Sequence, residues 1–142
     1  MSLLDDFRTK YDVNNLSILV TKYWTLSIRP QQLTFGSLLI SSNKNNCTCF
    51  SDLKFEELQD LHSIYGFLNM LQIRLNSEKI NYYSLMMIDK HLHSHVFFRY
   101  SCPTIIGSNI YTDEYFPGLL DFDSTLPLDP LMVKATLLEL IL

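Results

Sequence analysis

The sequence lacks the features that mark proteins built to cross membranes or to hold nucleic acids. No uninterrupted apolar run approaches the ~20 residues that a membrane span needs. Positive charge is not in excess either, because the formal net charge is −4. A chain without a bulk basic field does not attract a nucleic-acid backbone. We therefore expect neither a membrane nor a nucleic-acid polymer among the partners.

Cysteine is scarce, and the three cysteines suggest no disulfide framework. The number of cysteines is odd, which favours reduced thiols; they are Cys47, Cys49 and Cys102. Cys47 and Cys49 have the spacing of half a zinc site, but no second cysteine pair or nearby histidine follows them, so we favour free thiols there. The N-terminus, residues 1–6, is acidic and has no signal-peptide pattern. These features predict a cytoplasmic protein.

No repeat, low-complexity run or disordered tail divides the sequence. The chain has 142 residues, of which 47% are hydrophobic and 18% are charged. Both values are ordinary for a folded chain, and the length suits one core. We expect one domain over residues 1–142.

The apolar patterning predicts an α+β domain. A stripe at the helical period covers residues 53–75, where Ser51 or Asp52 is the expected cap. Asp89-Lys90 is expected to form the tight turn of an antiparallel hairpin. Further helices are expected at residues 3–12 and 128–142, and strands at 16–29, 37–41, 80–88 and 91–100. These elements predict an antiparallel sheet of about five strands, with one long helix packed across it and a short C-terminal helix.

Three of the four histidines stand at every second position of one stretch, as His91, His93 and His95. In an extended strand they share one face, roughly 6.5–7 Å apart. Each imidazole has two ring nitrogens that require partners, so three adjacent rings are costly core filler. The row therefore indicates a functional site.

Three interpretations of the row stay open at this point. Two of the histidines are well spaced to share a metal ion, although the outer pair is too far apart for one tetrahedral ion. Alternatively, a neutral imidazole attacks phosphorus while its neighbours donate hydrogen bonds to the oxygens. In the third interpretation the rings stack without any chemistry.

The stretch from His91 to Phe97 resembles the signature of the histidine triad nucleotide hydrolases and transferases, which is His-x-His-x-His followed by two apolar residues. Trp24 to Pro30 and Gly36 to Ile40 resemble the family's strand, proline loop and glycine-led strand. Asp113 to Pro117 is similar to a D-x-x-W-P segment of a bacterial branch, with Phe116 in place of tryptophan. Residues 51–57 and 80–89 resemble its helix entry and compact hairpin. The resemblance covers about residues 20–120.

The resemblance implies roles for the three histidines. His93 would be the nucleophile, attack the α-phosphate of a nucleotide and form a phosphoramidate that water cleaves. The backbone carbonyl of His91 would hold the His93 ring in the required tautomer, and the His91 ring would be buried and supporting. His95 would contact the phosphate oxygens. The implied substrates are dinucleoside polyphosphates, nucleoside phosphoramidates or adenylyl sulfate, with no cofactor and no metal.

Further substrate contacts are implied for five residues, which are Ser94, Ser27, Ser37, Asn81 and Arg99. Ser37 stands where the family often has histidine, and Ser27 lies near the position of a common asparagine. Phe98 replaces the common proline, and the long glycine-rich loop before the triad is absent. These departures bear on the choice of nucleoside and on the rate of turnover.

The resemblance also implies a homodimer, with which the apolar C-terminus is compatible. An alternative function is a nucleotide-binding protein with little or no turnover that acts as a sensor or interaction module. A metal-binding protein that uses the same histidines is the third hypothesis.

Overall fold

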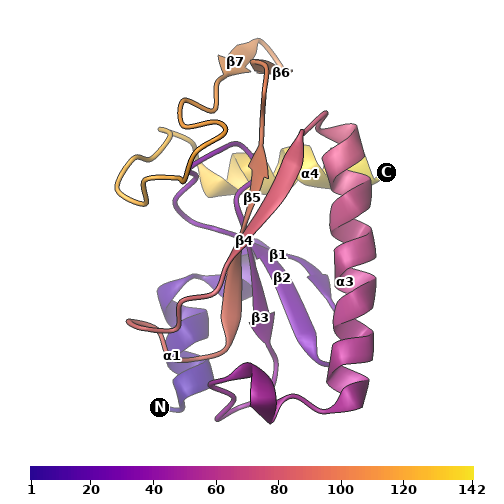
Figure 1. The fold of residues 1–142 in the computed structure, drawn as a ribbon, viewed down its shortest axis with the longest axis vertical. Coiled ribbons are helices and arrows are strands. Elements are labelled where there is room, and N and C mark those ends of the chain that lie inside the picture. Colours follow the sequence, from indigo (N-terminus) through magenta and orange to yellow (C-terminus); the bar gives the residue numbers. More distant parts are fainter.

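A five-stranded antiparallel sheet organises the chain, with its strands in the order β1-β2-β3-β5-β4 (Figure 1). The computed structural model describes residues 1–142. The strands are β1 (Ser17–Val20), β2 (Trp24–Ile28), β3 (Leu38–Ser42), β4 (Lys79–Tyr83) and β5 (His93–Arg99). A separate hairpin is formed by β6 (Thr104–Ile106) and β7 (Asn109–Tyr111). The expected α+β class and five-stranded sheet are confirmed.

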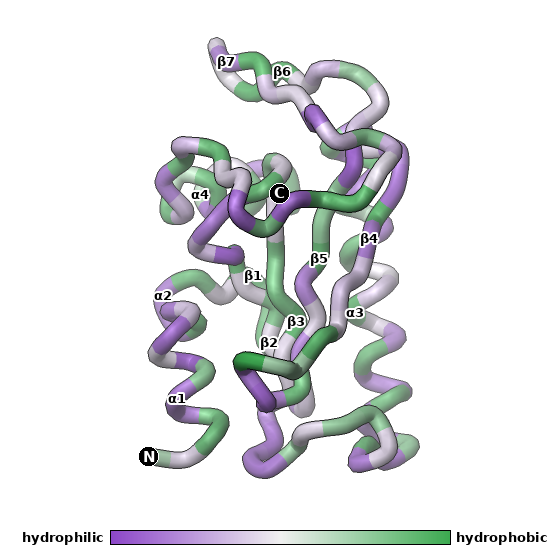
Figure 2. Tube along the Cα trace, turned by 60° about the vertical axis from the view of Figure 1, so that its left-hand side comes forward, coloured by the Kyte–Doolittle hydropathy of each residue, from purple (hydrophilic) through white to green (hydrophobic).

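Helices flank the sheet on both sides. The helices are α1 (Leu3–Lys10), α2 (Val13–Leu16), α3 (Phe55–Arg74), α4 (Pro130–Ile141) and the 3-10 turn η1 (Phe50–Asp52). The long helix α3 lies on one side of the sheet and α1 lies on the other (Figures 1 and 2). The expected long helix and short C-terminal helix are therefore both present. No helix combines the length and the apolar character needed to cross a membrane.

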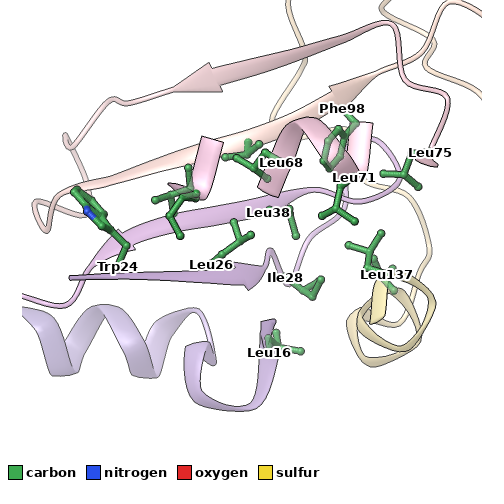
Figure 3. Close-up of a cluster of buried hydrophobic side chains, with 14 of the residues drawn as sticks. Leu16, Trp24, Leu26, Ile28, Leu38, Leu68, Leu71, Leu75, Phe98 and Leu137 are labelled. Carbon is green, nitrogen blue, oxygen red and sulfur yellow. The ribbon is translucent and has the colours of Figure 1, made fainter. Parts of the chain in front are cut away.

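The main core lies between the sheet and α3, and α4 contributes at one end (Figure 3). Trp24, Leu26 and Ile28 alternate along β2 and are buried against Leu68 and Leu71 of α3. Burial of each such side chain stabilises the fold by roughly 1.5–3 kcal/mol. This core fixes one face of the sheet, so the alternate side chains must point to the opposite face.

The opposite face carries the histidines. The register pairs Ser41 with His93 and Leu39 with His95, and Ser27 is the next residue across from Leu39. Helix α1 covers this face with Phe7, which is buried in a small cluster that includes Leu39. The histidine face is therefore enclosed between the sheet and α1.

Two local predictions at the ends of elements are wrong. Residues 13–16, expected as turn and strand, form the single helical turn α2, which follows Asp12 in the left-handed region at φ 50°. Neither Ser51 nor Asp52 caps α3, because the helix begins at Phe55. The Glu57 carboxylate accepts a hydrogen bond from the Lys54 N–H at 2.7 Å at that start.

The expected tight turn at residues 89–90 is also wrong. Strands β4 and β5 do pair antiparallel, but β4 ends at Tyr83 and residues 84–92 form the connection. Met86 has a φ of 46°, which interrupts the strand. Asp89 is held to the C-terminal end of α1 by Lys10 and Tyr11, so the connection reaches across to α1 and does not close tightly.

Candidate active site

The histidine row lies at the start of β5. His93 and His95 belong to the strand, and His91 lies two residues before it. Their exposed fractions are 1% for His91, 3% for His93 and 5% for His95. Phe7 of α1 packs against the row, with its ring centroid 4.8 Å from that of His93 and 5.1 Å from that of His91. Three imidazoles are thus buried side by side.

Backbone carbonyls fix two of the tautomers. His93 Nδ1 lies 2.6 Å from the His91 carbonyl oxygen, the contact that the resemblance predicts. A carbonyl can only accept, so His93 carries its proton on Nδ1 and keeps a lone pair on Nε2. His91 Nε2 donates in the same way to the Ser42 carbonyl at 2.7 Å, while its Nδ1 is buried without a partner. Each of these two rings is therefore held by a backbone carbonyl, and His93 keeps its lone pair on Nε2.

An arginine fixes the tautomer of the third ring. Arg29 Nε donates to His95 Nδ1 at 3.2 Å, so the His95 proton resides on Nε2. The rings of His93 and His95 lie edge to face, with centroids 5.0 Å apart. Two neighbouring rings thus carry a lone pair, on His93 Nε2, and an N–H donor, on His95 Nε2. That pairing suits attack on an electrophile whose oxygens receive a hydrogen bond.

Burial keeps the row neutral. Desolvation lowers the pKa of His91 and of His93 below 6.5. The pKa of His95 falls to about 3, first because of burial and then because of the positive charge on Arg29. The lowered pKa values favour the neutral imidazole at neutral pH, and neutral imidazole is the form that can act as a nucleophile.

A cavity of about 230 Å³, here called the triad cavity, opens at His93 and His95. Its other walls are Lys10, Tyr11, Arg29, Leu85, Met86, Met87, Ile88, Asp89 and Phe122. Lys10 forms an ion pair with Asp89 at 2.8 Å, and the Tyr11 hydroxyl donates to the same carboxylate at 2.6 Å. A second cavity of about 240 Å³ shares Lys10, Ile88 and Asp89 and reaches His91. The two cavities provide adjoining spaces along the histidine row.

The three predicted serines lie in different surroundings. The Ser27 hydroxyl is fully buried on the histidine face and has no hydrogen-bond partner. Ser37 Oγ accepts hydrogen bonds from the N–H groups of Leu33 and Thr34, so it stabilises the loop that precedes β3. Ser94 alternates with the histidines along β5, so its side chain points to the other face, where it bonds the Ser84 hydroxyl. Of the three, Ser27 alone has a free polar atom on the histidine face.

Asn81 and Arg99 form a network with Asp113. Arg99 Nε donates to the Asp113 carboxylate at 2.7 Å, and Arg99 Nη1 donates to Asn81 Oδ1 at 2.8 Å. The Arg99 and Asp113 side chains are 3% and 0% exposed. Neither Asn81 nor Arg99 lines the triad cavity. The structure therefore uses both residues to anchor the segment around Asp113 and does not bring them to the histidines.

Sequence reasoning missed Arg29, Tyr11, Asp89 and Phe122. Arg29 had a signal, because it stands two residues after Ser27 and so continues the same face of β2. Tyr11, Asp89 and Phe122 reach the cavity from α1, from the connection before β5 and from the segment before α4. Only the tertiary fold brings these three together.

The rings do not converge as metal ligands. No group of three or more histidine, cysteine, aspartate or glutamate side chains is arranged to hold a metal ion. One nitrogen each of His91 and His93 is bonded to a backbone carbonyl.

Solved structures of other proteins share the fold of this chain. A histidine triad protein from Sinorhizobium meliloti 1021 superposes with a TM-score of 0.68 at 19% identity, over 87% of this chain and 87% of that one. One from Marinobacter aquaeolei VT8 has a TM-score of 0.66 at 17% identity, over 91% of each chain. The chain has the histidine triad fold. No protein-family model and no curated protein matches it.

The histidine triad fold is also that of the diadenosine triphosphate hydrolase of Plasmodium falciparum. That structure superposes with a TM-score of 0.59 at 14% identity, over 89% of this chain and 74% of that one. At identities this low, these superpositions show a common fold.

Proposed function

We propose that this protein is a nucleotide hydrolase or nucleotidyl transferase that acts at an α-phosphate through a covalent nucleotidyl-His93 intermediate. Its substrates would be dinucleoside polyphosphates, nucleoside phosphoramidates or adenylyl sulfate. The hydrogen bond from His93 Nδ1 to the His91 carbonyl carries the proposal, because it leaves a lone pair on Nε2 at the triad cavity. The similar fold of a diadenosine triphosphate hydrolase supports it.

In the first step, the His93 Nε2 lone pair attacks the α-phosphorus. The new N–P bond forms as the bond from phosphorus to the leaving group breaks, and the leaving group departs with that electron pair. The Nε2–H of His95 donates a hydrogen bond to a phosphoryl oxygen, where negative charge develops. The Nδ1–H of His93 stabilises the positive charge on its ring by donating to the His91 carbonyl.

In the second step, water attacks the same phosphorus from the side opposite His93. The N–P bond breaks, its electron pair returns to Nε2, and the water loses a proton to solvent. A nucleoside monophosphate leaves and the neutral ring is restored. In a transferase, the acceptor would be another nucleophile in place of water.

The test is a panel of adenosine and guanosine phosphoramidates, dinucleoside polyphosphates and adenylyl sulfate. The native protein should release a nucleoside monophosphate from at least one of them. His93→Ala should lower that rate by about a thousandfold or more while nucleotide binding persists. His62→Ala is the matched control, because it removes a histidine from the exposed side of α3 and should retain the native rate.

The outcomes separate the two functions. Equal release by the native protein and His93→Ala would overturn covalent catalysis at His93. Binding of nucleotides without release of any product by the native protein would indicate the alternative, a nucleotide-binding protein with little or no turnover.

A further inference from the structure

Arg29 is a buried cation without a carboxylate partner. Its residue is 7% exposed, and none of the three ion pairs in the structure includes it. Nε donates to His95 Nδ1 at 3.2 Å and Nη1 donates to the Gln31 carbonyl at 2.7 Å. A guanidinium has five N–H donors, so three of them make no hydrogen bond within the chain.

The surroundings of Arg29 do not neutralise it. The faces of Phe97 and Phe122 lie 5.7 and 5.3 Å from the guanidinium carbon, which gives it aromatic contacts. The one carboxylate in the triad cavity, Asp89, is already bonded by Lys10 and Tyr11. A buried charge normally has an opposite charge beside it, because desolvation is otherwise costly. The cavity thus contains a cation whose counter-ion the chain does not supply.

The residue that carries these free N–H donors, Arg29, lines the same cavity as His93 and His95. Its Nη2 makes no hydrogen bond within the chain. The side-chain atoms that are both fully buried and unpartnered are Ser27 Oγ and His91 Nδ1, so Nη2 is not fully buried. A planar guanidinium fork matches the geometry of phosphate oxygens.

We propose that Arg29 binds an oxyanion in the triad cavity, donating from Nη2 to a phosphoryl oxygen of the group that His93 attacks. This inference rests on the proposed function and adds to it a phosphate-binding residue. Arg29 acts directly on the ligand and also holds His95 as an Nε2–H donor toward the same group. The phosphate thus receives hydrogen bonds from two neighbouring side chains.

The test uses inorganic phosphate as the probe, because its binding requires neither a particular nucleobase nor turnover. Its affinity is measured by titration calorimetry at constant ionic strength for the native protein, Arg29→Gln and Arg29→Lys. Loss of one charge-assisted hydrogen bond should weaken binding by about 10- to 100-fold in Arg29→Gln. Arg29→Lys should lie between the two, because it keeps the charge and loses the fork.

The matched control is Arg8→Gln. Arg8 is on α1 and donates to Asn43, so it lies near the histidine face but does not line the triad cavity. Its removal changes the net charge as Arg29→Gln does and should leave the phosphate affinity within about twofold of native. Equal affinities of Arg29→Gln and native protein, or no phosphate binding by the native protein, would overturn the proposal.

A second measurement needs no variant that risks unfolding. In the native protein, the Nε–H resonance of Arg29 should shift and saturate as phosphate is added. The Nε–H of Arg99, bonded to Asp113, serves as the internal reference and should not move. Movement of neither resonance would contradict anion binding by Arg29. Phosphate binding through Arg29 without any hydrolysis would leave this inference intact and overturn the catalytic proposal alone.

Discussion

Acid should destabilise this protein through His95, the most strongly perturbed ring of the row. Its pKa is about 3 in the folded chain, against 6.5 for an ordinary histidine. Because the folded pKa is the lower one, the unfolded chain binds the proton first as the pH falls. The stability contributed by neutral His95 is therefore complete above pH 6.5 and is lost as the pH falls from there toward 3.

The magnitude follows from the two pKa values. At pH 5 the histidine is protonated in the unfolded chain and neutral in the folded chain. This pH lies about 1.5 units below 6.5, the pKa of the unfolded histidine. Each unit corresponds to 1.36 kcal/mol, so His95 alone should lower the free energy of unfolding by about 2 kcal/mol between pH 7.5 and pH 5. A folded pKa anywhere below 4 gives nearly the same value. His91 and His93, whose pKa values are also lowered, act in the same direction.

Urea unfolding at pH 7.5 and at pH 5 measures the effect, with the native protein compared with His95→Gln. The variant has no ring to titrate, so its loss of stability over this range should be smaller by about 2 kcal/mol. His62→Gln removes a histidine from the exposed side of α3 and should behave like the native protein. An equal loss in the native protein and His95→Gln would refute the claim that His95 is buried as a neutral ring.

Three further predictions concern the scaffold. Asp113→Ala leaves Arg99 buried without its carboxylate and should cost about 3–5 kcal/mol in urea unfolding. The exposed neighbour change Glu114→Ala should cost under about 0.5 kcal/mol, and equal losses would contradict the buried ion pair. Phe7→Ala removes the ring packed on His93 and should lower stability by roughly 3 kcal/mol in the same assay, whereas a loss under about 1 kcal/mol would show that α1 is only loosely held on the sheet. The homodimer remains a prediction: light scattering should give twice the chain mass of 16.6 kDa, and a mass of 16.6 kDa would contradict it.

The sheet and its long helix were predictable because their signals are periodic. Alternation along β2 and the helical stripe of α3 each mark the face turned to the shared core. The element ends were harder to predict, since tertiary contacts set them. Asp89 lies in the hairpin connection and is bonded by Lys10 and Tyr11, about eighty positions earlier in the sequence.

The residues of the candidate site also fall into two groups, those that the local sequence reveals and those whose role only the fold shows. His91, His93 and His95 stand together in the sequence, so their common face follows from strand geometry alone. Arg99 was expected as a ligand contact, but Asp113 occupies its guanidinium. Conversely, the sequence places Arg29 on the same face as Ser27, but only the folded structure shows its hydrogen bond to His95. Pairing between distant segments decides which polar residues are free to bind a ligand.

Covalent chemistry at His93 is tested most directly by trapping the intermediate. The native protein is mixed with a dinucleoside polyphosphate, quenched within milliseconds in alkaline denaturant that preserves an N–P bond, digested and mapped by mass spectrometry. The nucleotidyl group should appear on His93 in the native protein and nowhere in His93→Ala. Release of nucleoside monophosphate with no adduct at any time point, or an adduct on another residue, would contradict a nucleotidyl-His93 intermediate.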